Sequence, residues 1–213
     1  MKGLHQVGYT IHRSNLTIDQ KEVRKLRKYA KDKARTIFNH NLKDRQDYKR
    51  KQTNFPKKLG NKLFRQIKNF TETYYSNLIS KEWSILLSLP GCHEQAPHCD
   101  YVQDDQFENV KDRDIPLSYI ICLQENTKIN LWVNSLKMVY RKPIAPIRKT
   151  EVKMNVGDVL VFRGDLVHAG SAYNDENIRV HGYLDSKTIK RICNQTYVIH
   201  QHAPVAVRKL IIT

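Results

Sequence analysis

Two histidines and one aspartate in this sequence have the types and spacing of metal ligands. His98 and Asp100 are separated by a single cysteine, and His168 follows 70 residues after the first histidine, at the end of the strand-like stretch GDVLVFRGDLVH. Alternate residues of a strand point to the same side, so His98 and Asp100 can face one interior together. Two imidazoles and a carboxylate on one side of a metal ion leave its other side open, as a non-haem Fe(II) centre that binds O₂ requires. Zinc accepts the same ligands, so these residues alone leave the metal open between iron and zinc.

An arginine beyond the second histidine indicates what binds next to this metal. Arg179 follows His168 by eleven residues, across the turn SAYNDEN. We expect the two flanking strands to pair antiparallel, with Arg179 beside His168 and deeper in the fold. A buried guanidinium needs an anionic partner, and its planar fork suits a carboxylate. The pattern therefore predicts a carboxylate site beside the metal, whereas Arg179 taken alone is typical of a surface or salt-bridged strand residue.

Short β-prone stretches separated by turns dominate the chain after residue 80. The expected strands are Glu82–Leu89, Leu117–Leu123, Ile129–Val133, Val152–Met154, Val159–Arg163, Val167–Ala169 and Arg179–Tyr183. Their spacing predicts a β-sandwich or barrel rather than βαβ units. The second histidine and the arginine would then lie on strands of one compact β-structure.

The order and spacing of these residues resemble the Fe(II)/2-oxoglutarate-dependent dioxygenase superfamily. The stretch GDVLVFRGDLVHAGSAYNDENIRVHGYLD is similar to the distal-histidine strands of phytanoyl- and prolyl-hydroxylase-type members, and LLSLPGCHEQAPHCDY looks like the segment that leads to their proximal ligands. The resemblance covers roughly residues 81–186. It implies an α+β fold in which residues 81–213 form a double-stranded β-helix, or jelly roll, with flanking N-terminal helices.

The resemblance also implies a role for each residue of the pattern. His98, Asp100 and His168 would be the ligands of Fe(II), and Arg179 would bind the C5 carboxylate of 2-oxoglutarate. With 2-oxoglutarate and O₂ as cosubstrates, such enzymes hydroxylate or oxidatively demethylate a substrate, and the protein supplies positioning and a dry pocket.

Enzymes of this type usually recruit a second polar residue for 2-oxoglutarate from an earlier strand. Tyr119, Ser118 and Asn130 are the candidates here, and Tyr119 ranks first because its side chain has the reach to contact a carboxylate. His181, two residues after Arg179, shares that residue's side of the strand. We expect it either to line the cosubstrate or substrate pocket or to be a satisfied interior histidine.

Most of the excess positive charge lies in the first 80 residues. The net charge is +16, and residues 1–80 hold 20 of the 37 Lys and Arg but 6 of the 21 Asp and Glu, a net +14. We expect this region to pack on the core as two amphipathic helices, one N-capped by Thr17 and one over Asn61–Leu78, with a short strand in His5–Arg13 and a loop over 39–58. The basic surface favours a nucleic-acid partner through phosphate contacts. The alternatives are an acidic protein partner or a solvated helix face.

Several classes of protein are excluded by composition. No apolar run approaches the roughly 20 residues that cross a bilayer, and the N-terminus has no apolar signal core, so we expect an intracellular protein, cytoplasmic or nuclear, with no membrane partner. The four cysteines form no C-x-x-C pair, which argues against a zinc ribbon. Three functions remain: an oxygenase acting on nucleic acid or a nucleic-acid-associated target, a protein or small-molecule hydroxylase, and a non-catalytic jelly-roll binding module. The oligomeric state is left open.

Overall fold

The computed structural model describes residues 4, 6–36, 48–101, 107, 110–136, 147–189, 191, 195–199 and 207–211, the last two ranges by their backbone alone. The long α-helices in the described part of the chain are α2 (Gln20–Lys33) and α3 (Asn61–Tyr74), and Asp112–Asp114 form a short 3₁₀ helix. The strands are β1 (Tyr9–His12), β2 (Arg35–Thr36), β3 (Arg50–Asn54), β4 (Ile79–Ser88), β5 (His98–Cys99), β6 (Leu117–Cys122), β7 (Thr127–Val133), β8 (Arg148–Met154), β9 (Val159–Arg163), β10 (His168–Gly170), β11 (Asn177–Asp185), β12 (Gln195–Ile199) and β13 (Val207–Ile211). No helix in the described part of the chain is long and apolar enough to cross a membrane.

The strands form two antiparallel sheets that face each other. The larger sheet has the order β1-β9-β6-β11-β4-β3-β2, and the smaller has the order β13-β12-β5-β10-β7-β8. From β4 to β11 the chain passes back and forth between the two sheets, with β4, β6, β9 and β11 in the larger and β5, β7, β8 and β10 in the smaller. This is the double-stranded β-helix topology, so the predicted α+β jelly-roll fold is confirmed.

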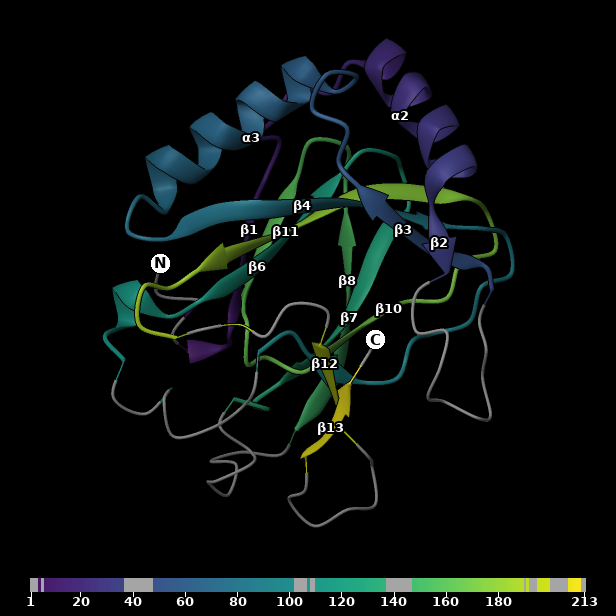
Figure 1. Cartoon of the computed structure of the whole chain (residues 1–213). Coiled ribbons are helices and arrows are strands. Elements are labelled where there is room, and N and C mark those ends of the chain that lie inside the picture. The colour runs from purple at the N-terminus through teal and green to yellow at the C-terminus, as the bar shows by residue number, and fades with distance from the viewer. Residues whose placement is uncertain are drawn as a thin grey trace.

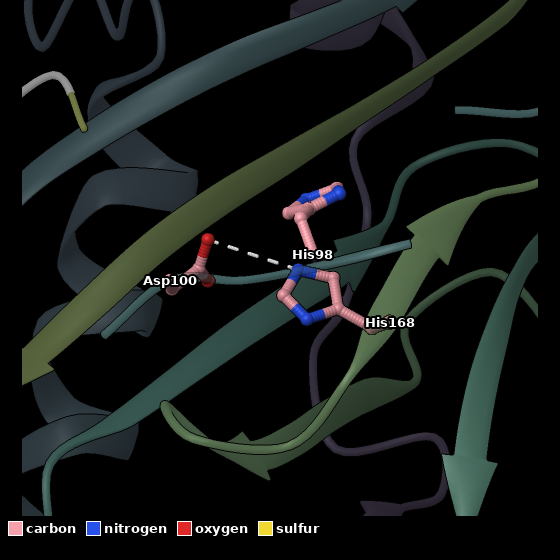
Figure 2. A group of neighbouring side chains, drawn as sticks. All are labelled: His98, Asp100 and His168. Atoms are coloured by element: carbon pink, nitrogen blue, oxygen red, sulfur yellow. Dashed lines mark ion pairs between the residues drawn. The ribbon is translucent and has the colours of Figure 1, made fainter. Parts of the chain in front are cut away.

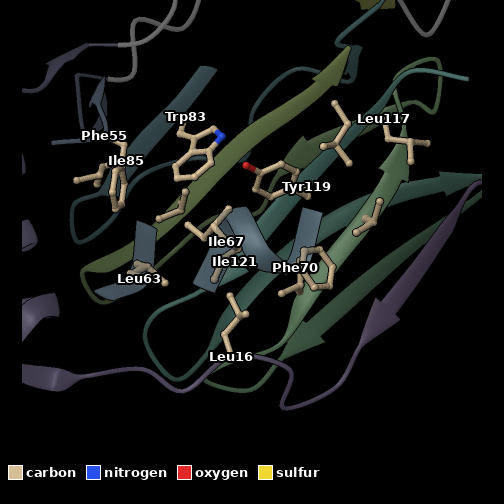
Figure 3. Packing of buried hydrophobic residues seen from close by; sticks show 14 of the residues in the cluster. Leu16, Phe55, Leu63, Ile67, Phe70, Trp83, Ile85, Leu117, Tyr119 and Ile121 are labelled. Carbon is tan, nitrogen blue, oxygen red and sulfur yellow. The ribbon is translucent and has the colours of Figure 1, made fainter. Parts of the chain in front are cut away.

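Both helices cover one face of the larger sheet, which we call its outer face (Figure 1). Apolar residues of α2 and α3, such as Leu26 and Ile67, join one buried cluster with Ile121 of β6 and Val180 of β11 (Figure 3). Alternate residues of these strands point the other way, toward the smaller sheet, and we call that side the inner face. There Ile120, for example, packs in a second cluster with residues of β7 and β8. The larger sheet is therefore buried on both sides.

The first helix begins later than the sequence pattern predicts. Asp19, not Thr17, is its N-cap: the Asp19 carboxylate accepts hydrogen bonds from the backbone N–H groups of Lys21, at 2.8 Å, and Glu22. The backbone N–H of Thr17 instead donates to the side-chain oxygen of Gln66 on α3. An aspartate offers a stronger, charged acceptor, which explains why the N-cap lies two residues after the predicted one.

The segment predicted as a loop over residues 39–58 contains a strand. β3 pairs antiparallel with β4, in register from Arg50 opposite Ser88 to Asn54 opposite Ser84. Its sequence, RKQTN, has no apolar residue, so the alternation that normally reveals a strand is missing and only the backbone pairing defines it. The predicted first strand is confirmed as β1, which pairs with β9. β1, β2 and β3, all from residues 1–80, are thus built into the larger sheet.

Candidate metal centre and carboxylate pocket

The three predicted ligands come together between the sheets. His98 on β5 lies directly opposite His168 on β10 in the strand register, and Asp100 follows β5. One ligand atom from each residue lies within 4.8 Å of the others, and all three side chains are buried. Nε2 of His168 lies 3.7 Å from Oδ1 of Asp100, as Figure 2 shows. The predicted His–Asp–His set is therefore one preformed group of donors.

Both imidazoles are oriented by their own backbone. Nδ1 of His98 lies 2.7 Å from the carbonyl oxygen of Ala96, and Nδ1 of His168 lies 3.0 Å from that of Leu166. A carbonyl only accepts, so Nδ1 carries the hydrogen in each ring and Nε2 keeps a lone pair for a cation. Burial lowers the pKa of both imidazoles, that of His98 to about 3. Both rings are therefore neutral and ready to act as ligands.

The carboxylate of Asp100 is fixed through one of its two oxygens. Ser118 of β6 donates its hydroxyl to Oδ2 at 2.5 Å, and Nε2 of His181 on β11 lies 3.3 Å from the same oxygen. Burial opposes ionisation, but attraction to the His168 imidazole, once that ring is protonated at low pH, and the hydrogen bond with His181 outweigh burial and hold the pKa of Asp100 below its ordinary value. The carboxylate is therefore ionised. Its other oxygen, Oδ1, faces His168 and remains available to bind a cation.

This donor set fits a divalent transition metal. Two neutral imidazole nitrogens and one carboxylate oxygen, held by partners in a second layer, are the ligands that Fe(II), Mn(II) and Zn(II) accept. Two of the donors lie on paired strands of the smaller sheet and Asp100 directly follows one of them, while Ser118 and His181 reach across from the larger sheet. The arrangement can hold one ion without rebuilding the fold.

Arg179 is buried on the inner face of β11, but its strand does not pair as predicted. β11 pairs with β4 and β6 in the larger sheet, and β10 pairs with β5 and β7 in the smaller sheet. Arg179 is only 3% exposed and donates to Ser88 Oγ at 3.1 Å and to Asn177 Oδ1 at 3.4 Å, with its guanidinium 5.3 Å from the ring centre of Tyr173. These partners are all uncharged.

The buried carboxylates in the described part of the chain pair with other residues: Asp158 with Arg13, Asp165 with Arg163, and Asp100 with His168 and His181. Within those described residues, no aspartate or glutamate forms an ion pair with Arg179. A fully buried guanidinium without a counter-ion is costly unless an anion from outside completes the site. This supports the prediction of a carboxylate site, although the predicted strand pairing was wrong.

Two of the residues predicted to contact 2-oxoglutarate point away from this site. Tyr119 lies in the cluster under the helices, on the outer face of the larger sheet, with its hydroxyl 3.3 Å from Ser80 Oγ. Asn130 lies opposite Ala169 in the register, whereas Leu131 lies opposite His168, so Asn130 is on the other face of the smaller sheet. Alternate residues of a strand point to opposite sides. Tyr119 and Asn130 are each one residue away from a residue that faces the metal group, so their side chains point away from it.

Other predicted and unpredicted residues do reach the inner face. Ser118 and His181 are brought to the site, where both contact Asp100. Arg50 and Ser88 were missed by sequence reasoning: the guanidinium of Arg50 lies 3.5 Å from the same Ser88 hydroxyl that Arg179 contacts. Arg50 stands in a strand with no apolar residue, so no sequence signal indicated that its side chain would be buried.

The fold is shared with several solved structures, two of which hold α-ketoglutarate or 2-oxoglutarate. The epimerase SnoN, in complex with Fe³⁺, α-ketoglutarate and nogalamycin RO, aligns with a TM-score of 0.60 at 13% identity, over 100% of this chain and 93% of SnoN. A Pseudomonas putida prolyl-4-hydroxylase aligns with a TM-score of 0.58 at 13% identity, over 87% of this chain and 96% of the hydroxylase. HygX from Streptomyces hygroscopicus, with nickel and 2-oxoglutarate bound, aligns with a TM-score of 0.57 at 9% identity, over 88% and 86%. No protein-family model and no curated protein matches the sequence.

Proposed function

We propose that this protein is an Fe(II)- and 2-oxoglutarate-dependent oxygenase that hydroxylates or oxidatively demethylates its substrate. The observation that carries the proposal is the pairing of a preformed His–Asp–His group with Arg179, a buried cation whose described partners are all neutral. A zinc site would need the three ligands but has no use for the arginine. The solved neighbours that bind iron or nickel together with the 2-oxo acid support the same assignment.

The distance from the metal group to Arg179 suits this cosubstrate. His181 contacts the ligand Asp100, and Arg179 is two residues away on the same face of β11, which corresponds to roughly 7 Å along a strand. The carbon chain of 2-oxoglutarate, four C–C bonds of about 1.5 Å, is roughly 5 Å long when extended. One end can therefore reach the metal while the C5 carboxylate meets the guanidinium.

Each residue then has a defined task. His98, Asp100 and His168 would hold the iron, which together with 2-oxoglutarate and O₂ would supply oxidation of a C–H bond with release of succinate and CO₂. Ser118 and His181 keep Asp100 in its one-oxygen orientation. The sheets on either side exclude water, because inner-face residues such as Ile120, Leu131 and Phe162 pack in one buried cluster.

For the substrate we propose a small molecule or a protein side chain rather than nucleic acid. The basic helix α2 packs on the outer face of the larger sheet, whereas the metal group lies on the inner side. Part of its charge is also neutralised: Arg27 and Lys31 both form ion pairs with Glu176. The compared proteins include an epimerase from nogalamycin biosynthesis and a prolyl-4-hydroxylase. The net charge of +14 in residues 1–80 keeps nucleic acid as the second candidate.

The test is metal-dependent turnover of 2-oxoglutarate. Purified protein with Fe(II) should release succinate from 2-oxoglutarate slowly without substrate, and His168→Ala should release none. Wild-type protein that binds neither Mn(II) nor 2-oxoglutarate more tightly than His168→Ala would contradict the enzyme assignment. For the substrate class, single-stranded DNA or RNA should leave the succinate rate unchanged at physiological salt. Stimulation by either polynucleotide would favour the nucleic-acid candidate instead.

A further inference from the structure

Arg50 reaches from one sheet to the other beside the metal group. It stands on β3, outside the eight strands of the jelly roll, and its side chain is buried. Nε donates to the carbonyl oxygen of His93 at 2.8 Å, and Nη2 donates to those of Gly170, at 3.1 Å, and Ser171. Gly170 is two residues after His168 on β10. The guanidinium therefore contacts the backbone of the strand that carries a metal ligand.

The missing side chain of Gly170 makes room for this guanidinium. Gly170 and His168 point to the same face of β10, since they are two residues apart. A Cβ atom added to Gly170 would lie 2.7 Å from Nη1 of Arg50 and would also clash with the side-chain oxygen of Gln95. Nη1 of Arg50 thus occupies the inner side of β10, on the face from which His168 points to the metal group.

Arg50 and Arg179 meet at one hydroxyl group. Ser88 Oγ lies 3.5 Å from Nη1 of Arg50 and 3.1 Å from Nη1 of Arg179, so these two nitrogens are no more than 6.6 Å apart. Both guanidinium groups are positively charged, so an anion that binds beside this hydroxyl is attracted by both of them. The structure brings both cations to the same end of the inner face.

We propose that Arg50 is a specificity-determining residue of the cosubstrate pocket. It places a second guanidinium beside Arg179 at the far end of the pocket, which favours a 2-oxo acid that carries a second carboxylate at C5. This inference rests on the proposed function, because it assigns the 2-oxo acid to the same pocket. Arg50 acts here by charge and by holding Ser88, not by touching the reacting atoms.

The experiment compares two acids that differ only at C5. 2-Oxopentanoate has the chain length of 2-oxoglutarate but a methyl group in place of the C5 carboxylate. Binding of each to the full-length protein loaded with Mn(II) is measured by titration calorimetry, for wild type, Arg50→Met and the control Lys51→Met. Lys51 is the next residue of β3 and points to the opposite side of the strand. Mn(II) affinity and thermal unfolding are recorded for each variant.

We expect Arg50→Met to weaken 2-oxoglutarate by about 10- to 100-fold, the loss of one charge-assisted interaction, while the affinity for 2-oxopentanoate stays within about twofold. Lys51→Met should behave as wild type. A folded, Mn(II)-binding Arg50→Met that keeps wild-type selectivity overturns the inference, and so does an equal loss for both acids, which would indicate a purely structural clamp. If Arg50→Met does not fold, Arg50→Lys answers the same question by the same criterion, with an expected loss of about 3- to 10-fold confined to 2-oxoglutarate. Wild-type protein that binds no 2-oxoglutarate refutes the proposed function itself, a different result from either.

Discussion

Arg179→Met should make the ligand-free protein no less stable and should abolish its stabilisation by 2-oxoglutarate. The wild-type guanidinium is 3% exposed and its described hydrogen-bond acceptors are the neutral oxygens of Ser88 and Asn177. Methionine fills most of the same volume and carries no charge, so it removes the cost of burying a cation along with two hydrogen bonds. Replacing a buried ion pair by apolar residues of similar volume is often neutral or stabilising by about 1–4 kcal/mol, and we expect the same of a buried cation that has no counter-ion among the described residues. We expect the free energy of unfolding to change by between 0 and about +3 kcal/mol.

The same substitution should remove the stabilisation that 2-oxoglutarate gives to the wild-type protein. Urea unfolding of Mn(II)-loaded protein, with and without 2-oxoglutarate at about 100 times its wild-type Kd, should show a gain of about 2.7 kcal/mol for wild type. The same concentration should give Arg179→Met almost no gain, because the C5 carboxylate has lost its partner. The refuting result is a loss of more than about 3 kcal/mol in the unliganded variant, the usual cost of leaving one partner of a buried ion pair alone. That result would mean that Arg179 already has an internal counter-ion, and the argument for a carboxylate pocket would fail.

Three further predictions test the metal group and its supports. His168→Ala should abolish Mn(II) binding measured by calorimetry, whereas His93→Ala, an exposed histidine outside the group, should bind as wild type; equal binding by both variants would refute the ligand assignment. Ser118→Ala removes a hydroxyl that donates to the ligand carboxylate and should weaken Mn(II) by about 10- to 100-fold with little loss of stability, so an unchanged Kd would show that the hydroxyl has no part in orienting the carboxylate. Gly170→Ala places a Cβ 2.7 Å from the Arg50 guanidinium and should lower the free energy of unfolding by about 1–3 kcal/mol in urea titrations, a cost that would be absent if the guanidinium were free to move aside.

The metal group was predictable because its signals are local. His98 and Asp100 are two residues apart, and His168 ends a run of apolar strand residues, so residue type and short-range spacing were sufficient to select them. The residues that contact Asp100 could not be selected from the sequence in the same way. Ser118 and His181 come from the opposite sheet, and only the three-dimensional packing decides that they meet the same carboxylate oxygen.

The errors have a common cause, which is that strand parity and sheet membership are set by tertiary structure. Tyr119 and Ser118 are neighbours in sequence, and packing of the helices on one side of β6 decides which of them faces the metal group. Arg179 was expected beside His168 in one sheet, but the chain crosses from the smaller sheet to the larger one between β10 and β11. Arg179 is buried as predicted, but the pairing of β10 with β11 on which that prediction was based does not occur.

The arrangement of the two sheets also changes how the positive charge of residues 1–80 is interpreted. A nucleic acid lying on α2 would be separated from the metal group by the whole thickness of the larger sheet and its two apolar clusters. A base would have to travel around the sheet edge to react, so affinity for phosphate at α2 would not by itself deliver a substrate. β3 lies next to the edge strand β2 of the same sheet, and its Arg50 side chain reaches the inner face. Through Arg50 this strand offers a route by which residues 1–80 can influence the chemistry, and the Arg50→Met titration measures that influence directly.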